Sequence, residues 1–598
     1  MSGKSSETKR ALGKLDYGLL VIFIMPLILL SINRTWIFSS HGLADPWIYL
    51  GHFLRLEQHL NVFTGTYYIT RLSWIIPGYL VYKLFPPLIA NYVLHLGFYY
   101  TAVISLYLIL KLTVNRRAAL LAAILMGCYS YFLVAIGWDY VDGAGITYFL
   151  VTVLMLTCAG MVAHNKVWLY LSGFFYAALI YSNTGWGVFT PSLAVYYFSI
   201  NHIHRKNSVL TSLVFPVIGF LCITLLLCTV SYTINRQFLF FLPSLTFSIE
   251  TINQPNPWKA DWKTWFPYAT WLILPCLTFL VSIITLLSNW LATRFTKLTI
   301  SNPLTGYLQL FFILNFLTMI ILEIRGTVVL QLTFYASYLI PPMFLAIGSQ
   351  MESIANRFKP QHYLLITFSI VTLALLPYSP WFDKVYVYIL SSLLCVIGLY
   401  LLFFTRIISQ KRLVTALIAL VLIFNLYSFA SDQTIWVISG NEPDQKMQFA
   451  LKSQVSNPNV LQLHPADEDT FLASVEAQNF LKVVDPGANL LFWYNYDESP
   501  VYRSISSACL WGYRLAGEKF PRLGLATGFP DPQPTIEQLR SIFKVFPRVV
   551  ILSKRKDVFQ EARQSLNQAD FDAKFLSKQE VQQGDFSLMM TFIEIIQK

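Results

Sequence analysis

Charged side chains are scarce in this chain, and those that could do chemistry stand in a few polar loops. Asp45 and Arg71 lie in the first long loop, Asp139 and Asp142 in a second, and Arg325 in a later one. A carboxylate can take a proton from a hydroxyl group, and a guanidinium group binds oxyanions through paired hydrogen bonds. Carboxylates and arginines brought together would therefore suit a site that activates a hydroxyl group and holds an anionic leaving group.

Each of these residues also has a purely structural explanation. Asp45 precedes Pro46, so it could cap a helix that has proline at its first position. Asp142 opens an apolar run and could cap it in the same way, although capping alone would accept Asn or Ser as readily. Arg71 precedes an apolar segment and could extend toward lipid headgroups instead. The sequence alone leaves these alternatives open.

The histidines and the remaining charges of the first loop suggest less. His41, His52 and His59 are spaced too loosely to indicate a metal site. Arg55 and Glu57 are expected on the solvated face of a helix. No metal ligand is therefore assigned and no cofactor is certain, and whether a divalent cation takes part stays open.

The composition indicates which elements must position these residues. Of 598 residues, 55% are hydrophobic and only 12% are charged, with a mean hydropathy of +0.54. Soluble domains carry about 25% charged residues. The sequence therefore predicts a membrane protein with many spans and excludes an ordinary cytosolic enzyme. The net charge of +12 comes from short basic loops rather than one patch, which argues against a nucleic-acid partner.

Apolar runs close to the twenty residues that a bilayer requires occur about thirteen times. Charged residues stand only at the edges of these runs, which counts against ion-coupled transporters and voltage sensors, because those proteins place ionisable groups at the membrane midplane. The predicted spans are 16–33, 86–110, 116–136, 142–163, 167–183, 185–201, 209–232, 266–289, 305–322, 328–348, 362–380, 385–404 and 413–431.

Orientation follows from the loops between the spans. Every second loop is basic, and basic loops face the cytoplasm. With an odd number of spans, the N-terminus is expected in the cytoplasm and the C-terminal tail outside. The basic positions are Lys4, Lys9, Arg10, Lys14, Lys111, Arg116, Arg117, Lys166, Arg205, Lys206, Arg294, Lys297, Arg357, Lys359, Arg406, Lys411 and Arg412.

Three outer segments are large. Residues 46–60 alternate apolar side chains with a polar set that includes His52, which predicts a helix lying flat at the membrane surface. Segment 233–265 is rich in tryptophan and proline and is expected to act as a lid. The composition becomes soluble from 432, which predicts a membrane domain over 1–431 and an exported α/β domain over 432–598. Strands are expected there at 489–494, 548–552 and 587–596, and helices at 468–483 and 555–568.

The order of motifs resembles a known family. An acidic residue, Asp45, follows the first span, and Arg71 begins the segment Arg-Leu-Ser-Trp-Ile-Ile-Pro. Later come Leu-Phe-Pro (84–86), Asn-Arg-Arg (115–117), Trp-Asp-Tyr-Val-Asp (138–142) and Tyr-Leu-Ile-Pro-Pro (338–342). Over roughly 15–430 this order resembles the C-type integral-membrane glycosyltransferases. Within that group the chain resembles the branch of protein O-mannosyltransferases and lipid A aminoarabinose transferases and is similar to glycosyltransferase family 39.

The resemblance implies a polyprenyl-phosphate-linked sugar as donor and a reaction at the outer face of the plasma (inner) membrane. It implies that Asp45 is the general base, and that Asp142, with Asp139 as the alternative, assists. Arg71 matches the basic residue that contacts the lipid phosphate. Where the family often has a basic residue before its Tyr-Leu-Pro segment, this chain has Ser337, so Arg325 is the expected substitute. Tyr338 is expected at the donor.

Two other classes of function compete with an enzyme. One is a transporter or flippase for lipid-linked saccharides, and the other is a membrane-anchored envelope assembly protein that works through its exported domain. The acceptor of an enzyme is left open as a glycan, a lipid or a protein. Clustering of Asp45, Asp142, Arg71 and Arg325 at one outer cavity would favour the enzyme over both competitors.

Overall fold

The computed structural model describes a large part of the helical region and the strands of the tail. The described residues are 16–32, 49, 52–53, 56–57, 60, 66–137, 140–161, 165–204, 211–253, 272–296, 303–328, 330, 335–356, 434–439, 447–451, 460–462, 490–494, 523–527, 536–553, 558–583 and 586–598.

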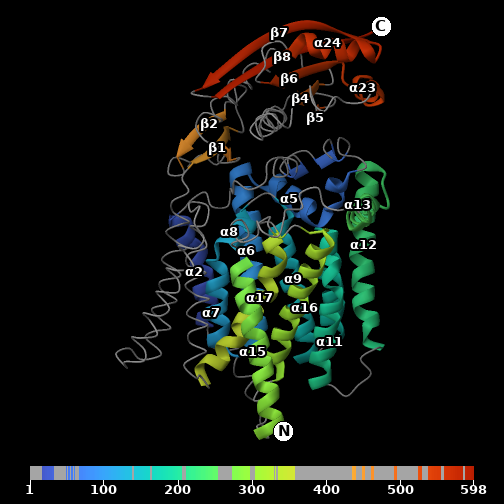
Figure 1. Cartoon of the computed structure of the whole chain (residues 1–598). Helices are drawn as coiled ribbons and strands as arrows, with labels where there is room; N and C mark the ends of the chain where they lie inside the picture. The colour runs from blue at the N-terminus through green and yellow to red at the C-terminus, as the bar shows by residue number, and fades with distance from the viewer. Residues whose placement is uncertain are drawn as a thin grey trace.

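Up to residue 356 the described chain is helical (Figure 1). Short 3-10 turns, η2 (Tyr67–Thr70) and η3 (Thr184–Phe189), interrupt the helices. The α-helices are α2 (Tyr17–Ile32), α5 (Leu72–Leu84), α6 (Pro87–Thr113), α7 (Arg116–Gly127), α8 (Ser130–Gly137), α9 (Val141–Met161), α10 (Asn165–Ile180), α11 (Thr190–His204), α12 (Val214–Asn235), α13 (Leu242–Asn253), α15 (Ile273–Thr296), α16 (Pro303–Arg325) and α17 (Ala336–Asn356).

Among the described residues, five helices are long and apolar enough to cross a membrane: α6, α9, α12, α15 and α16. Counting the bent pair α7 and α8 as one span gives six, and α2 and α10 are apolar but shorter. Helices overlap each of the first ten predicted spans, with α15 and α17 beginning and ending later than expected. The last three, 362–380, 385–404 and 413–431, lie outside the described residues, so the number thirteen stays a prediction.

Hydrogen bonds between side chains join the helices where their apolar faces meet. Such bonds help hold membrane helices together, because lipid offers buried polar groups no partner. Thr157 of α9 pairs with Tyr196 of α11 at 2.7 Å, and Ser192 of α11 donates to Asn315 of α16 at 2.7 Å. These bonds join α9 and α16 to α11, and so they help to position α9, whose first turn carries Asp142.

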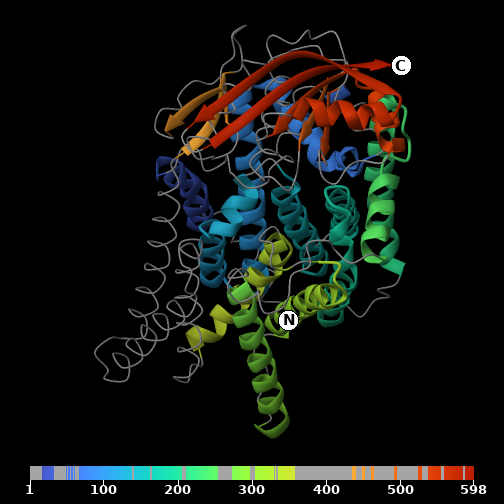
Figure 2. The ribbon, with the colours of Figure 1, turned by 45° about the horizontal axis from the view of Figure 1, so that its top comes forward.

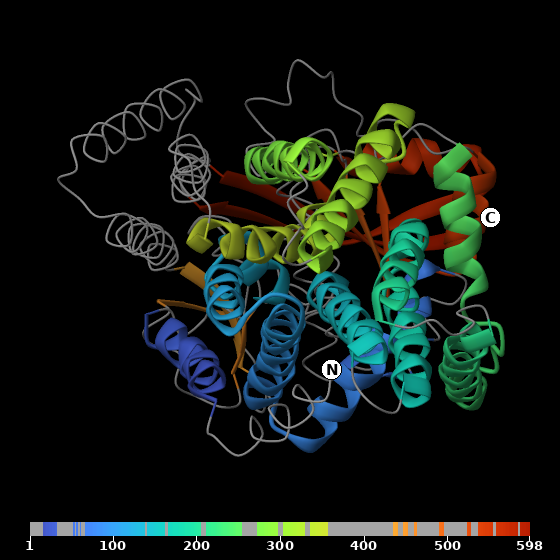
Figure 3. The same ribbon diagram turned by 90° about the horizontal axis from the view of Figure 1, so that it is seen from below.

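Small residues let α10 and α12 approach closely. A Cβ atom on Gly173 would lie 1.8 Å from the carbonyl oxygen of Pro216, and one on Gly219 would lie 1.9 Å from the carbonyl oxygen of Tyr170. Seen along the helices, α12 lies at the margin of the bundle (Figure 3), and most of its span is exposed. The pair of glycines therefore provides the close contact by which α12 packs on α10.

The amphipathic segment 46–60 packs its buried face on α5. Its described positions are helical, and Phe53 lies with its ring 5.2 Å from that of Trp74, directly over Gly78. Glu57 is exposed, as expected. The placement of His52 on the polar face was wrong: it is fully buried next to Phe53, because an imidazole ring can pack among aromatic rings. How this segment lies relative to the bilayer stays a prediction.

The tail forms two sheets. One has the order β2-β1-β3, antiparallel, with β1 (Thr434–Ser439), β2 (Met447–Leu451) and β3 (Val460–Gln462). The other has the order β5-β4-β6-β8-β7, in which β4, β5 and β6 are parallel and β7 and β8 antiparallel. Its elements are β4 (Leu490–Tyr494), β5 (Leu523–Thr527), β6 (Arg548–Ser553), β7 (Phe571–Gln583) and β8 (Phe586–Gln597), with α23 (Ile536–Phe543) and α24 (Val558–Gln568).

The predicted strands of the tail therefore coincide with β4, β6 and β8, and the helix expected at 555–568 with α24. The helix expected at 468–483 lies outside the described residues. Strand β6 is buried from Val549 to Ser553, as the central strand of a covered sheet should be. The sheets lie beyond one end of the helices, the end that carries α5 and α13, and β7 and β8 run across it (Figure 2).

Candidate functional site

Arg71 is enclosed by tyrosine rings. It stands between η2 and α5 and is only 7% exposed. Its guanidinium carbon lies 4.9 Å from the ring centre of Tyr67, 4.8 Å from that of Tyr140 and 5.7 Å from that of Tyr49. One guanidinium nitrogen donates a hydrogen bond to the Tyr49 hydroxyl at 2.7 Å. We call Tyr49, Tyr67 and Tyr140 the tyrosine cage.

The cage keeps a permanent positive charge at a buried position. Burial disfavours the charged guanidinium group, but the tyrosines outweigh burial and hold the pKa of Arg71 above its usual value. Cation–π contacts of this kind stabilise a cation by about 0.5–2 kcal/mol each. No carboxylate among the described residues forms an ion pair with Arg71. A buried cation of this kind is suited to binding an anion.

Asp142 lies in the first turn of α9 and is 3% exposed. One of its carboxylate oxygens accepts a hydrogen bond from the Ser337 hydroxyl of α17 at 3.3 Å. The next residue, Tyr338, has its hydroxyl within electrostatic reach of both Asp142 and Arg71. The structure therefore brings together Arg71, Asp142 and Tyr338, which are far apart in the sequence.

The turn η3 forms a tight wall against Tyr338. The Trp186 ring lies 4.6 Å from the Tyr338 ring, and Asn183 hydrogen-bonds to the Tyr338 hydroxyl. A Cβ atom at Gly185 would come within 2.7 Å of that hydroxyl oxygen. Glycine at 185 thus allows the backbone to approach Tyr338, and the tyrosine is held from the ring side and from the hydroxyl side.

Helix α13, part of the expected lid 233–265, contacts both turns that border the site. Phe247 stacks on Tyr67 of the cage at 4.9 Å, with the two rings 21° from parallel. The Thr184 hydroxyl shares hydrogen bonds with Ser248 at 2.7 Å and Ser244 at 3.1 Å. The described part of the lid therefore lies beside the site. Its closing movement stays a prediction, and residues 254–265 lie outside the described chain.

Of the other predicted site residues, only Arg325 falls within the described chain. Asp45 and Asp139 lie outside the described residues. Arg325 ends α16 and is exposed, and within the described chain no ion pair or hydrogen bond links it to Arg71 or Asp142. Its expected role at the phosphate stays a prediction. Nearby Glu323 is buried and accepts the backbone N–H of Leu330 at 2.6 Å.

The cage is the part of the site that sequence reasoning missed. A signal was present, because Tyr67 lies four residues before Arg71 and Tyr140 two residues before Asp142. Tyrosines are abundant in this chain, so none stood out. As for metals, no group of three or more His, Cys, Asp or Glu side chains converges within the part of the chain that the structure describes.

No protein-family model matches the chain, and no curated protein matches its sequence. Solved structures match by fold. The crystal structure of ArnT from Cupriavidus metallidurans bound to undecaprenyl phosphate matches with a TM-score of 0.53 and 10% identity, over 96% of this chain and 97% of that chain.

The same ArnT in its apo state matches with a TM-score of 0.50 and 12% identity, over the same shares of the two chains. The oligosaccharyltransferase of Archaeoglobus fulgidus, tethered with an acceptor peptide, is more distant, with a TM-score of 0.43, 11% identity, and 90% and 69% of the two chains covered. ArnT is a lipid A aminoarabinose transferase of the C-type group. The chain therefore has the fold of the C-type membrane glycosyltransferases, as the order of its motifs predicts.

Proposed function

We propose that this protein is a membrane glycosyltransferase that moves a hexosyl or pentosyl group from a polyprenyl-phosphate donor to an acceptor at the outer face of the plasma membrane. The observation that carries the proposal is the convergence of Arg71, Asp142 and Tyr338 at one end of the helices. The fold shared with ArnT, which has been crystallised with undecaprenyl phosphate, supports it.

The proposed roles follow from the chemistry of the side chains. In sugar transfer, a carboxylate takes the proton of the attacking hydroxyl group while cations hold the departing phosphate. Asp45 is the proposed general base. Asp142, or alternatively Asp139, orients the acceptor or a divalent cation. Arg71 binds the phosphate. The Tyr338 hydroxyl adds a second polar group beside the bound phosphate.

A second cation is part of the proposal. Arg325 is the proposed additional phosphate contact, in place of the basic residue that the family often has where Ser337 stands. In this chain Ser337 donates to Asp142 instead, which holds that carboxylate near Tyr338. Residues 1–431 are proposed to form the catalytic membrane domain and 432–598 an exported domain. The acceptor is proposed to be a glycan, a lipid or a protein.

The test measures lipid-phosphate binding first, because it needs neither the sugar nor the acceptor. Undecaprenyl phosphate is added to the purified full chain, and its dissociation constant is measured from the shift in melting temperature. Removing a charge-assisted hydrogen bond costs about 1.5–3 kcal/mol. Arg71→Met is therefore expected to weaken binding by about 10- to 150-fold.

Lys544→Met in the tail is the matched control and should bind as the wild type does. Equal affinity of Arg71→Met and the wild type would contradict the phosphate role of Arg71. The sugar and the acceptor are then found by mass spectrometry of the envelope glycans, lipids and glycoproteins of cells that lack the protein. Unchanged glycans, lipids and glycoproteins in these cells would contradict the proposal and favour the envelope assembly protein.

A further inference from the structure

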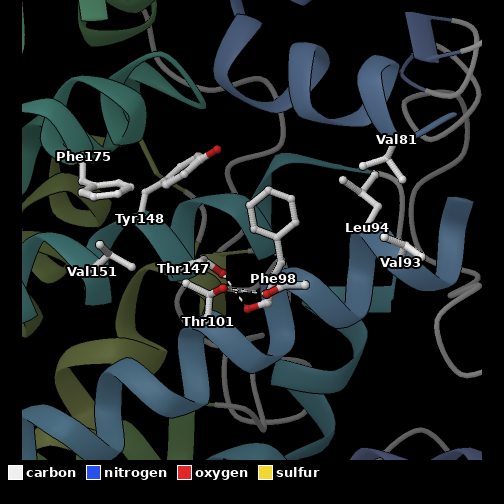
Figure 4. Close-up of a pocket in the computed structure, with 10 residues that line it drawn as sticks. Val81, Val93, Leu94, Phe98, Thr101, Thr147, Tyr148, Val151 and Phe175 are labelled. Atoms are coloured by element: carbon white, nitrogen blue, oxygen red, sulfur yellow. Dashed lines mark hydrogen bonds between the residues drawn. The ribbon is translucent and has the colours of Figure 1, made fainter. Parts of the chain in front are cut away.

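A cavity lies on the side of the helical bundle, between four helices. Its volume is about 340 Å³, and its lining is mostly apolar (Figure 4). Val81 of α5, Gly97 and Phe98 of α6, Tyr148 of α9 and Phe175 of α10 are among the residues that line it. We call it the lateral pocket.

The polar atoms of the lateral pocket already have partners. The Thr101 hydroxyl donates to the carbonyl of Gly97, and the Thr147 hydroxyl to that of Gly143, each at 2.7 Å. The Tyr148 hydroxyl donates to the backbone carbonyl of Ser73 at 2.8 Å. Water needs several polar partners in a cavity, and a polar ligand needs groups to recognise. The lining therefore favours an apolar occupant.

The pocket lies at the depth of lipid chains. Tyr148 is seven residues beyond the start of α9, about 10 Å along a helix, and Gly97 is ten residues beyond the start of α6, about 15 Å. Both helices start at the end of the bundle that carries the candidate site, and the hydrocarbon core of a bilayer is about 30 Å thick. The pocket therefore falls in the half of the membrane nearer the candidate site, which is the outer half in the predicted orientation.

The pocket is continuous with a surface that faces lipid. Leu80, Leu84, Ile89 and Val93, on α5 and α6, are 40–75% exposed. Gly97 is exposed, and a Cβ atom there would meet nothing within 4 Å, so the pocket opens to the surface at this position. In a bilayer such a lateral opening is filled by the surrounding hydrocarbon, because a void leaves its lining without contacts.

The pocket and the candidate site lie on different faces of α9. Gly145 and Phe149 of α9 contact Trp186, on the side of Tyr338, whereas Thr147, Tyr148 and Val151 line the pocket. A donor held at Arg71 would lie on the first side. The lateral pocket is therefore separate from the proposed phosphate site.

We propose that the lateral pocket binds one acyl chain of an outer-leaflet phospholipid. The lateral pocket is connected to the segment of Arg71 through its wall. The Tyr148 hydroxyl donates to the carbonyl of Ser73, and the Ser73 hydroxyl donates to the carbonyl of Ala178 at 2.6 Å. Ser73 is two residues from Arg71. The bound chain thus supports the start of α5, next to Arg71. The importance of this support for donor binding rests on the proposed function, whereas binding of the acyl chain does not.

The test is photo-cross-linking in a membrane. The full chain is placed in vesicles of phosphatidylethanolamine and phosphatidylglycerol that contain a trace of phosphatidylethanolamine with a diazirine in its acyl chain. Labelled residues are identified by mass spectrometry. Phe98, Tyr148 and Phe175 are expected to be labelled more strongly than Leu221 of α12, an exposed position outside the pocket.

A filling variant and its matched control sharpen the result. Gly97→Leu fills the opening of the pocket, so labelling of Phe98 and Phe175 should fall to the level of Leu221. Gly306→Leu makes the same change in α16, where a Cβ atom would meet only Leu286, at 3.5 Å, and should leave the labelling unchanged. Persistent labelling in Gly97→Leu, or labelling no stronger than at Leu221 in the wild type, would overturn the proposal.

A competition experiment distinguishes a phospholipid acyl chain from a polyprenyl chain as the occupant of the lateral pocket. Saturating undecaprenyl phosphate should leave the labelling of Phe98 and Phe175 unchanged, since the donor belongs on the other face of α9. Loss of labelling would identify the occupant as the polyprenyl chain and overturn the assignment to phospholipid. Labelling needs no sugar and no acceptor, so its failure and that of the proposed enzyme activity are distinguishable.

Discussion

Arg71 is held by contacts that a lysine could not make. A planar guanidinium group stacks on aromatic rings and can donate two parallel hydrogen bonds to a phosphate, whereas an ammonium group is a compact point charge. Here three tyrosine rings lie within 6 Å of the guanidinium carbon. The cage therefore orients the group as well as keeping it charged.

Arg71→Lys should keep the charge and lose the orientation. We expect the dissociation constant of undecaprenyl phosphate to rise about tenfold, equivalent to about 1.4 kcal/mol, which is less than for Arg71→Met. Binding is measured by the melting-temperature shift of the purified chain. A lysine variant that binds as tightly as the wild type would show that the cage contributes only packing.

Asp45→Asn separates catalysis from capping. Asparagine caps a helix as well as aspartate does, so the variant should fold and insert normally. It should lose most of its rate of sugar transfer, because positioned general bases contribute about 10²- to 10⁴-fold. The rate is compared at equal amounts of inserted protein. Near wild-type transfer would mean that Asp45 is a cap and nothing more.

At this scale the sequence predicted Arg71, Asp142 and Tyr338 as site residues, and the structure brings them together, but the sequence did not indicate what surrounds them. These three belong to recognisable motifs, whereas the role of Tyr49 depends on a segment 22 residues away folding back onto Arg71. The contact of Ser337 with Asp142 spans 195 residues. Such pairings come from packing between helices, and local patterns carry no information about them. His52 was misplaced for a similar reason, since its burial depends on its neighbours in space.

Among the elements, α2 is fastened at the residue that precedes it. Asp16 accepts the backbone N–H of Gly18 as a helix cap, and it forms ion pairs with Lys111 at 2.6 Å and Arg116 at 2.9 Å. Burial alone would raise the pKa of Asp16. Its hydrogen bonds from Lys111, Tyr107 and Gly18 outweigh burial and lower this pKa to about 2. One carboxylate thus joins α2 to the end of α6 and the start of α7.

Asp16→Ala should lower stability by about 1–2 kcal/mol through loss of the cap, in addition to the ion pairs. Asp16→Asn keeps the cap and loses only the ion pairs, so it should melt between the wild type and Asp16→Ala. Because the folded pKa is depressed, the ionic stabilisation is complete above about pH 4 and is lost as the pH falls through 2. The difference between wild type and Asp16→Asn should therefore stay constant from pH 5 to 8 in thermal melts. A difference that vanishes toward pH 5 would contradict this assignment.

The contact of α10 with α12 should tolerate no side chain at its two glycines. Gly219→Ala would press a methyl group against the backbone of Tyr170, and overpacking of a closed contact costs about 1–3 kcal/mol. We expect a lower yield of monodisperse protein and a lower melting temperature. Gly306→Ala, with ordinary space around it, should behave as the wild type. Equal behaviour of the two variants would show that α12 can move away at no cost.

Helices were the most predictable elements, because the bilayer sets the length of each apolar run separately. The breaks within the predicted spans were harder to predict. Residues 116–136 were expected as one span, but the chain forms α7 and α8 at an angle of 64° to each other. No proline marks this break. The short helix α5 and the turns η2 and η3, which hold the site, are likewise too short for a clear periodic pattern.

For the whole molecule, the arrangement of the loops predicts that the tail and the candidate site are on the same side. The sheets of the tail lie at the end of the helices that carries α5 and α13, which agrees with this expectation. Which membrane face this end occupies is still a prediction. A reporter enzyme that works only in the cytoplasm, fused after Lys598, should be inactive, whereas the same reporter fused before Met1 should be active. The reverse pattern would overturn the orientation.

The architecture of the tail was predictable only in part. Its strands β4, β6 and β8 are apolar runs bounded by polar residues, and so they could be found locally. Their order could not, because β4 pairs with β5 and β6 across long intervals of chain. The overall fold could be expected from the motif order, although the sequence itself matches no family model.

The close approach of α10 and α12 has a consequence for genetics. A saturation screen for loss of function should return Gly173 and Gly219 among its most intolerant positions, beside Arg71 and Asp142. The intolerant positions would form two clusters in the structure, and only the cluster with Arg71 and Asp142 would be expected to bind substrate. Scoring the abundance of each variant in the membrane would divide the two sets, since the glycine variants should disappear from the cell while the arginine and aspartate variants remain.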